Sequence, residues 1–306
     1  EKLSFGFRIK GLTQAMTKDQ SIRDDINAAF ESGGMLIFED VDATNEMQAA
    51  ISNIFGPMKE HPVKSLARVD PDGLPGVIEL KSGRDSGGIV KFGGQQVSHW
   101  LPWHFDHAYN NELNRAGVLR PIIIAPEGGM TGFADGIDLY RTLPPELQEK
   151  IEGLNVIYHL GTMILNMRFG KPANLRGLRN SAEGLRVEEE ANKVARAIHP
   201  AVWTRDSGEK VLHVSLLHAV GLEGHENPEG DALLEAVCRH IVGDSGARES
   251  NNKSTYYHQW KPGQMLTWDN WRLLHCVTGA DPTCPRRMHR TTIKGDYGLG
   301  YFEAAM

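Results

Sequence analysis

The chain has 306 residues, of which 40% are hydrophobic and 24% charged, and its formal net charge at pH 7 is −6. This composition supports a large core, and without a basic block it argues against a nucleic-acid or anionic-membrane partner. Three cysteines without a C-x-x-C pair argue against a disulfide framework or a structural zinc cluster, and no apolar run approaches the ~18 residues of a membrane span. We therefore expect a soluble, cytoplasmic protein whose partner is a small molecule. The sequence is compatible with a monomer and with a homo-oligomer.

The first part of the chain shows two helical patterns separated by a strand. Apolar residues recur at helical spacing over 17–32, where Thr17 is the predicted N-cap and Gly33-Gly34 the predicted end. A similar pattern predicts a helix over 45–54, and the apolar run 35–38 predicts a buried strand. These elements carry no residues that suggest chemistry.

Regularity is lost from residue 57 to residue 96, and glycines are concentrated in the second half of this stretch. A glycine-rich segment over 82–97 is typical of a mobile lid beside a site. A disordered surface loop fits the same pattern equally well.

The rest of the chain alternates short apolar runs, turn residues and helical patterns. Strands are predicted for 116–125, 154–160, 254–260, 265–268, 273–277 and 287–294, with a hairpin over 199–215. Helices are predicted for 142–151, 180–197 and 228–242, the last with Asn227 as its cap. Since no linker or repeat divides the chain, we expect one domain over residues 1–306, mainly β with peripheral helices.

The stretch Trp103-His104-Phe105-Asp106 places an imidazole and a carboxylate two residues apart. On a strand these two side chains point to the same face. His275, far along the chain, is the best candidate for a third ligand. Two His and one carboxylate form the facial triad of non-haem Fe(II) oxygenases, which leaves positions open for a cosubstrate and dioxygen. By itself, the spacing is also typical of an exposed polar pair on a strand.

Activating dioxygen takes more electrons than one Fe(II) ion supplies, so such a centre needs a reducing cosubstrate. 2-Oxoglutarate would bind the metal through its keto oxygen and adjacent carboxylate, leaving a remote carboxylate that requires a fixed cation. Arg suits this role because it is permanently charged and can form bidentate pairs. Arg286 and Arg290 follow His275 and share one face of a predicted strand. A basic surface cluster is the alternative interpretation.

The chain resembles the TauD/TfdA family of Fe(II)- and 2-oxoglutarate-dependent dioxygenases from about Phe5 to Gly295. The motifs that carry the resemblance follow one another in the family's order: Trp103-His104-Phe105-Asp106, Gly128-Gly129-Met130-Thr131, His199-Pro200 before a hairpin, Asp269-Asn270 ahead of His275, and Arg286 to Arg290. The resemblance implies a double-stranded β-helix, or jelly roll, with helical insertions. It also implies a hydroxylase-type oxygenase that converts 2-oxoglutarate and O2 to succinate and CO2.

Carried over by position, the family's functional residues fall on six residues of this chain. The iron ligands would be His104, Asp106 and His275. The residues that bind 2-oxoglutarate would be Thr131, Arg286 and Arg290.

The substrate residues are implied by a shorter segment. The stretch from Phe55 to Lys64 resembles the family segment whose His helps to bind substrate, which makes His61 a candidate. Lys64 and Trp100 stand where taurine-oxidising members have Tyr and Asn, so taurine is not the expected substrate. Because His61, Lys64 and Arg290 could together bind an anionic group, we expect a small organic acid.

Two other classes of protein remain as alternatives. The His104-x-Asp106-His107 spacing resembles part of a zinc-hydrolase pattern, but Pro102 stands where that pattern has its first His. A non-catalytic jelly-roll binding protein would keep the fold without turnover. A halogenase of this superfamily is excluded because Asp106 fills the position where halogenases lack a carboxylate.

Overall fold

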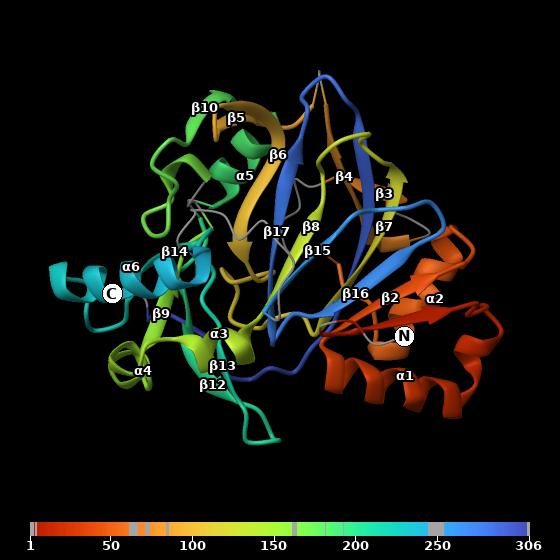
Figure 1. The fold of residues 1–306 in the computed structure, drawn as a ribbon, viewed down its shortest axis with the longest axis horizontal. Helices are drawn as coiled ribbons and strands as arrows, with labels where there is room; N and C mark the ends of the chain where they lie inside the picture. Colours follow the sequence, from red (N-terminus) through yellow and green to blue (C-terminus); the bar gives the residue numbers. More distant parts are fainter. Residues whose placement is uncertain are drawn as a thin grey trace.

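The computed structural model describes residues 3, 5–60, 67–70, 74–83, 86–160, 164–180, 182–191, 193–243 and 254–304. Two large β-sheets form its centre (Figure 1). The seven strands of the first sheet lie in the order β1 (Phe7–Lys10), β2 (Met35–Glu39), β16 (Met265–Asp269), β7 (Ala116–Ile123), β18 (Arg286–Ile293), β4 (Leu74–Ser82) and β3 (Arg68–Asp70). The six strands of the second lie in the order β10 (Arg176–Arg179), β5 (Ile89–Phe92), β6 (Gln95–His104), β17 (Leu273–Ala280), β8 (Thr131–Asp135) and β15 (Thr255–His258).

The two sheets pack against each other through a shared core. Leu119, Trp268 and Met288 of the first sheet belong to the same buried cluster as Phe133 and Leu273 of the second. Apart from the parallel pair β1 and β2, the strand pairs of both sheets are antiparallel. Facing antiparallel sheets are the architecture that the family resemblance implied.

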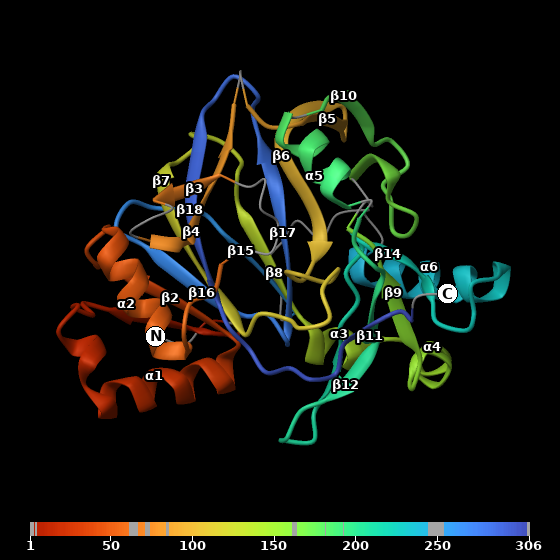
Figure 2. The same ribbon diagram turned by 180° about the vertical axis from the view of Figure 1, so that it is seen from behind.

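Two helices cover the outer side of the first sheet, at the end of the molecule that holds the N-terminal region (Figures 1 and 2). These are α1 (Gln20–Gly33) and α2 (Asn45–Phe55), preceded by the short helix η1 (Met16–Lys18). Ile26 and Phe30 of α1 and Met47 and Ile51 of α2 share a buried cluster with Phe38 of β2. The apolar spacing that predicted both helices is therefore the face that they bury.

The start of α1 differs from the expectation. Its N-cap is Asp19, whose carboxylate accepts hydrogen bonds from the backbone N–H groups of Ser21 and Ile22. Thr17 was the expected cap, but its hydroxyl donates to the carbonyl of Gln14 inside the preceding turn. The expected end is found, because Gly34 adopts a left-handed φ of 73° just after the helix.

A second, smaller layer packs at the opposite end of the molecule (Figure 1). Its sheet has the order β14 (Ala219–Leu222), β9 (Asn155–Tyr158), β11 (Ala197–Pro200) and β19 (Tyr301–Phe302), with a hairpin of β12 (Val202–Thr204) and β13 (Lys210–Leu212). The helices of this part are α3 (Gly136–Thr142), α4 (Pro145–Ile151) and α6 (Pro228–Val242). The remaining helical elements are η2 (Ile164–Asn166) and α5 (Ala182–Ala191), and α5 lies beside β5 and β10 (Figures 1 and 2). As expected, Asn227 caps α6.

The stretch from 57 to 96 was expected to lack regular structure, with a lid or a disordered surface loop over 82–97, and the expected irregularity is wrong for much of it. The structure places β4, β5 and the start of β6 there. Six residues of β4 pair with β18, and four residues of β5 pair with β6. β4 is hydrogen-bonded to a strand that is distant in sequence, and β5 to its sequence neighbour. The many glycines of this stretch gave no local sign of either strand.

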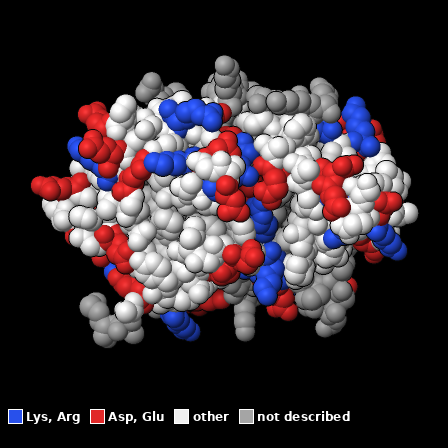
Figure 3. All heavy atoms as spheres, turned by 90° about the horizontal axis from the view of Figure 1, so that it is seen from below, with Lys and Arg blue, Asp and Glu red and all other residues white. Residues whose placement is uncertain are grey.

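None of the described helices is long and apolar enough to cross a bilayer. The three cysteines, Cys238, Cys276 and Cys284, form no disulfide bond. Acidic and basic side chains are interspersed over the face shown in Figure 3, without a block of one sign. This distribution agrees with the absence of a charge run in the sequence.

Candidate metal centre

The structure brings together the three residues that sequence reasoning proposed as metal ligands. His104 ends β6, and His275 lies directly opposite it on β17, with their ring centroids 4.1 Å apart. One potential ligand atom from each of His104, Asp106 and His275 lies within 4.8 Å of the others, and all three residues are buried. Two imidazoles and one carboxylate at this separation can bind a single divalent ion and leave its remaining positions open.

Asp106 does not belong to the strand, as the i, i+2 argument assumed. β6 ends at His104, and Asp106 begins a turn. The side chain of Asn270 holds this turn: its Oδ1 accepts from the backbone N–H of Asp106 at 2.8 Å, and its Nδ2 donates to the Asp106 carbonyl at 3.1 Å. Asn270 also donates to the carbonyl of Asn114 at 3.1 Å. A buried amide thus fixes the carboxylate that faces the two histidines.

The surroundings of His104 favour the form that binds metals. Its Nδ1 lies 2.7 Å from the carbonyl of Pro102, an acceptor, so Nδ1 carries the proton and Nε2 keeps its lone pair. Burial, and then the neighbouring His275, hold the pKa of His104 well below its ordinary value. The ring is therefore neutral at physiological pH, as metal coordination requires.

Arg290 balances the charge of Asp106. Its Nη1 donates to Oδ1 of Asp106 at 2.8 Å, and both side chains are nearly inaccessible to solvent. Burial would raise the pKa of Asp106, but Arg290 and His275 more than offset it and hold that pKa well below its usual range. Asp106 is consequently a carboxylate, the form that serves as a ligand.

Arg286 is a buried cation without an acidic partner in the described part of the chain. It is 4% exposed, and its Nε donates to the carbonyl of Gly129 at 3.2 Å. Burial lowers its pKa to about 10, which leaves it charged at neutral pH. Gly129 must be glycine here: its φ is 64°, and a Cβ at this position would lie 3.0 Å from Cδ of Arg286.

Arg286 and Arg290 come from the same face of β18, with Met288 between them. Because buried charges are costly unless they are compensated, an unpaired guanidinium of this kind is a natural binding site for an anion.

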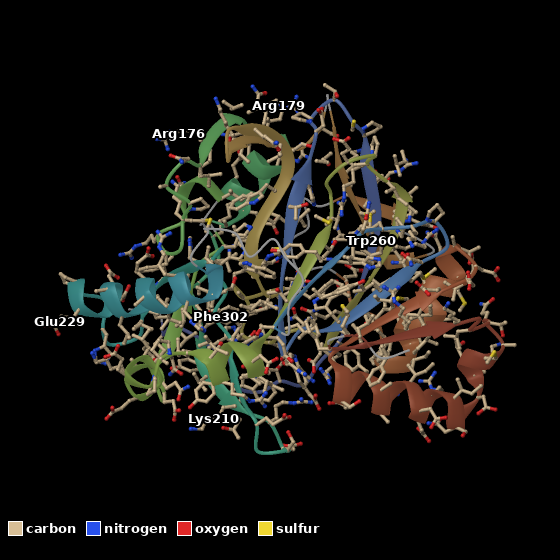
Figure 4. All side chains as sticks on the ribbon, in the orientation of Figure 1. Arg176, Arg179, Lys210, Glu229, Trp260 and Phe302 are labelled. Carbon is tan, nitrogen blue, oxygen red and sulfur yellow. The ribbon has the colours of Figure 1, made fainter. Side chains whose placement is uncertain are left out.

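Thr131 lies at the start of β8 and is buried. Two residues further along β8, Phe133 pairs with His275 of β17, so Thr131 lies on the strand face that carries the histidine. Nε1 of Trp260 donates to its hydroxyl oxygen at 3.1 Å, and Trp260 is labelled in Figure 4. This bond orients the threonine hydroxyl, and sequence reasoning had not identified Trp260.

The other residues named in the sequence analysis lie outside the candidate metal centre or outside the described residues. His61 and Lys64 lie outside the described residues. His107 is buried but does not belong to the group that could hold a metal. Trp103 packs in the main core with its ring 6.0 Å from that of Tyr257.

The fold and this centre together define a class: a jelly-roll protein with a two-histidine, one-carboxylate site of the kind that non-haem oxygenases use. A family model described as "Taurine catabolism dioxygenase TauD, TfdA family" matches residues 3–292. The chain therefore belongs to the TauD/TfdA family of 2-oxoglutarate-dependent dioxygenases.

Characterised relatives agree with this assignment. The chain is 28% identical to the (S)-phenoxypropionate/alpha-ketoglutarate-dioxygenase of Sphingobium herbicidovorans, over 96% of this chain and 93% of the relative. It is 26% identical to the alpha-ketoglutarate-dependent 2,4-dichlorophenoxyacetate dioxygenase of Cupriavidus pinatubonensis, over 89% and 88%. It is 22% identical to an alpha-ketoglutarate-dependent sulfate ester dioxygenase of Pseudomonas putida, over 96% and 88%.

Solved structures share the fold. A putative alpha-ketoglutarate-dependent taurine dioxygenase from Burkholderia xenovorans superposes with a TM-score of 0.70 at 20% identity, over 100% of this chain and 97% of that one. The structure of AAD-2 in complex with Mn(II) and N-oxalylglycine gives a TM-score of 0.66 at 23% identity, over 97% and 96%. The expectations of a jelly roll, an oxygenase, a metal and 2-oxoglutarate (alpha-ketoglutarate) are confirmed.

Proposed function

We propose that this chain hydroxylates a small organic acid, and that Fe(II) binds to His104, Asp106 and His275. The observation that carries the proposal is the convergence of these three buried side chains within 4.8 Å. When bound, Fe(II) and 2-oxoglutarate supply the activation of dioxygen, which yields succinate and CO2 and places one oxygen atom on a substrate C–H bond. If the oxidised carbon carries a heteroatom, the alcohol can collapse with cleavage of that bond.

The protein's own part is to bind, to orient and to exclude water. Arg286, which has no acidic partner among the described residues, would hold the remote carboxylate of 2-oxoglutarate, and the oriented hydroxyl of Thr131 would donate to it. Arg290 keeps Asp106 ionised and in place, and lies where it can also attract an anionic group beside the metal. The burial of all these residues strengthens their electrostatic interactions.

The choice of an organic acid rests on charge. Two buried arginines face the site, and His61 and Lys64, by resemblance, would add polar or cationic groups on the substrate side. The names of the relatives support acids as well, since two of them describe phenoxyalkanoates and one describes sulfate esters. We infer that an aryloxyalkanoate or another small carboxylic acid is the first class to try.

The test is a screen for substrate-stimulated succinate production under air with Fe(II) and 2-oxoglutarate. The panel contains phenoxyacetate, both enantiomers of 2-phenoxypropionate, an alkyl sulfate and taurine. We expect a carboxylic acid to increase succinate formation, and taurine to have no effect. The oxidised product is then identified by mass spectrometry.

One test variant and one control variant distinguish the oxygenase from the two alternative functions. His104→Ala should abolish succinate formation, including the slow reaction without substrate, whereas His225→Ala, at an exposed position, should not affect it. Normal succinate formation by His104→Ala would refute the ligand assignment. Zinc-supported hydrolysis of a panel compound would favour a hydrolase, and metal-free binding without any turnover would favour a binding protein.

A further inference from the structure

His213 is a fully buried histidine that follows directly after β13. Its backbone N–H donates to the carbonyl of Ala201 at 2.9 Å, which ties it to the start of the hairpin of β12 and β13. Three residues further on, the N–H of Leu216 donates to the carbonyl of Trp103 at 3.0 Å. The segment after the hairpin is therefore bonded to the end of β6, just before the first two proposed metal ligands.

One face of the His213 ring lies on Phe105. The two ring centroids are 3.9 Å apart and the ring planes are inclined by only 13°, so the rings are stacked. Phe105 is also fully buried, and it stands between His104 and Asp106 in the chain. Because the close-packed core encloses both rings, this contact restricts the movement of Phe105 and of the backbone on either side of it.

The edge of the same ring reaches Asn270. Nε2 of His213 lies 2.9 Å from the carbonyl oxygen of Asn270. A carbonyl oxygen only accepts, so Nε2 carries the proton and donates. Asn270 begins the turn between β16 and β17, the strand of His275, and its side chain holds both backbone groups of Asp106. An anchored carbonyl fixes the position from which this side chain reaches Asp106.

The imidazole uses its one N–H for this bond. Burial lowers the pKa of His213 to about 3, so the ring is neutral at neutral pH and carries a single N–H. Nδ1 is buried and makes no hydrogen bond in the described part of the chain. One side chain thus contacts both turns that bring the ligands together: the turn of Asp106 through Phe105, and the turn before β17 through Asn270.

We propose that His213 is a positioning residue of the metal centre. By holding Phe105 and Asn270 in place, its ring fixes the direction in which Asp106 presents its carboxylate. Arg290 contacts that carboxylate itself, whereas His213 acts on the backbone that carries it. This inference rests on the ligand set of the proposed function.

The experiment measures Mn(II) affinity by calorimetry in the protein without cosubstrate. His213→Phe keeps a ring that can stack on Phe105 and removes the N–H that the Asn270 carbonyl accepts. The Mn(II) affinity should fall about tenfold, at the lower end of the loss expected when an outer contact of a metal ligand is removed. The electron paramagnetic resonance spectrum of bound Mn(II) should also change, because the carboxylate approaches the ion from a different direction.

A donor at the same reach should restore part of the affinity. The amide nitrogen of a glutamine is as many bonds from Cα as Nε2 of a histidine, so His213→Gln can donate to the Asn270 carbonyl without a ring. Its Mn(II) affinity should exceed that of His213→Leu, which has neither donor nor ring. Equal Mn(II) affinities in these two variants would overturn the role of the Nε2–H group.

The route through Asn270 is tested with a double variant. Asn270→Ala already removes the side chain that holds Asp106, so adding His213→Phe should lower the Mn(II) affinity by less than about a further twofold. A contribution to core stability alone would leave the Mn(II) affinity unchanged. Ile51→Val, fully buried on α2, is the control: it should lower the thermal stability and leave the Mn(II) affinity unchanged.

Wild-type Mn(II) affinity in His213→Phe would overturn the inference. The same loss from His213→Phe in the Asn270→Ala background as in the wild type would also overturn it, because His213 would then act independently of Asn270. If His104→Ala bound Mn(II) as tightly as the wild type, the ligand set of the proposed function would fail, which is a separate result.

Discussion

Nη1 of Arg290 lies 2.8 Å from Oδ1 of Asp106, so a buried guanidinium shares its carboxylate partner with the metal site. The strand β18 and the turn after β6 are 184 residues apart at this contact. In the metal-free protein, Arg290 therefore provides the main compensation for the buried charge of Asp106.

Replacement of Arg290 by alanine should destabilise the metal-free protein by about 3–5 kcal/mol, because it leaves Asp106 buried without its partner. Mn(II) should then stabilise the variant more than it stabilises the wild type, since the ion supplies the compensation for Asp106 that Arg290 no longer provides. Thermal or urea denaturation with and without Mn(II) measures both effects. Arg287→Ala is the matched control, because its half-exposed guanidinium lies 3.7 Å from Glu79 and should contribute less than about 1 kcal/mol. Equal Mn(II) stabilisation in Arg290→Ala and wild type would contradict this account.

Loss of the Asn270 side chain should weaken metal binding without removing a ligand. Asn270→Ala deletes the bonds to both backbone groups of Asp106, and we expect a loss of about 2–4 kcal/mol of stability and of about 10- to 100-fold in Mn(II) affinity. Metal titration followed by calorimetry tests this. Asn53→Ala, at an exposed position on α2, serves as the control. Wild-type Mn(II) affinity in Asn270→Ala would show that the turn keeps its shape without the amide.

Replacement of Arg286 should lower the affinity for 2-oxoglutarate without changing the affinity for the metal. Arg286→Gln removes a charge-assisted hydrogen bond, so the affinity of the Mn(II)-loaded protein for 2-oxoglutarate should fall about 10- to 150-fold while Mn(II) affinity stays the same. Arg287→Gln, one residue along β18 and on the opposite face, should change neither quantity. An unchanged 2-oxoglutarate affinity in Arg286→Gln would remove the role assigned to this arginine.

His213 should make the metal-free protein sensitive to acid. Burial lowers the pKa of His213 to about 3, and Nε2 makes a hydrogen bond of 2.9 Å with the carbonyl of Asn270. In the unfolded chain a histidine binds its proton near pH 6.5. Between these two values the unfolded state holds more protons, so stability falls as the pH falls, by up to about 1.4 kcal/mol per pH unit for each such residue.

The variant His213→Phe isolates this contribution. It should show a shallower decline of unfolding free energy between pH 6 and pH 4 than the wild type, as measured by urea denaturation in the presence of a chelator. His225→Phe, at an exposed position, is the control. Parallel pH profiles for wild type and His213→Phe would mean that this histidine is not kept neutral in the folded protein.

Sequence reasoning proposed the triad and both arginines because the motifs that contain them follow one another in the family's order, and the structure brings the three proposed ligands within 4.8 Å of one another. It also predicted most strands and helices, since α1, α2 and α6 bury the faces that their periodicity marked. It missed β4 and β5 because the pairing of β4 with β18 joins residues about 200 positions apart, and their local glycines suggested a loop. It also missed α3, which Asp135 caps at the end of β8.

The sequence by itself determined which groups are available: two imidazoles, a carboxylate, two arginines and a threonine, in an order shared with the family. Only the tertiary structure decided how they are held. The turn of Asp106 depends on Asn270, and the charge of Asp106 depends on Arg290. These relationships join strands and turns that are distant along the chain, and the physical reason is that long-range packing, rather than local propensity, fixes them.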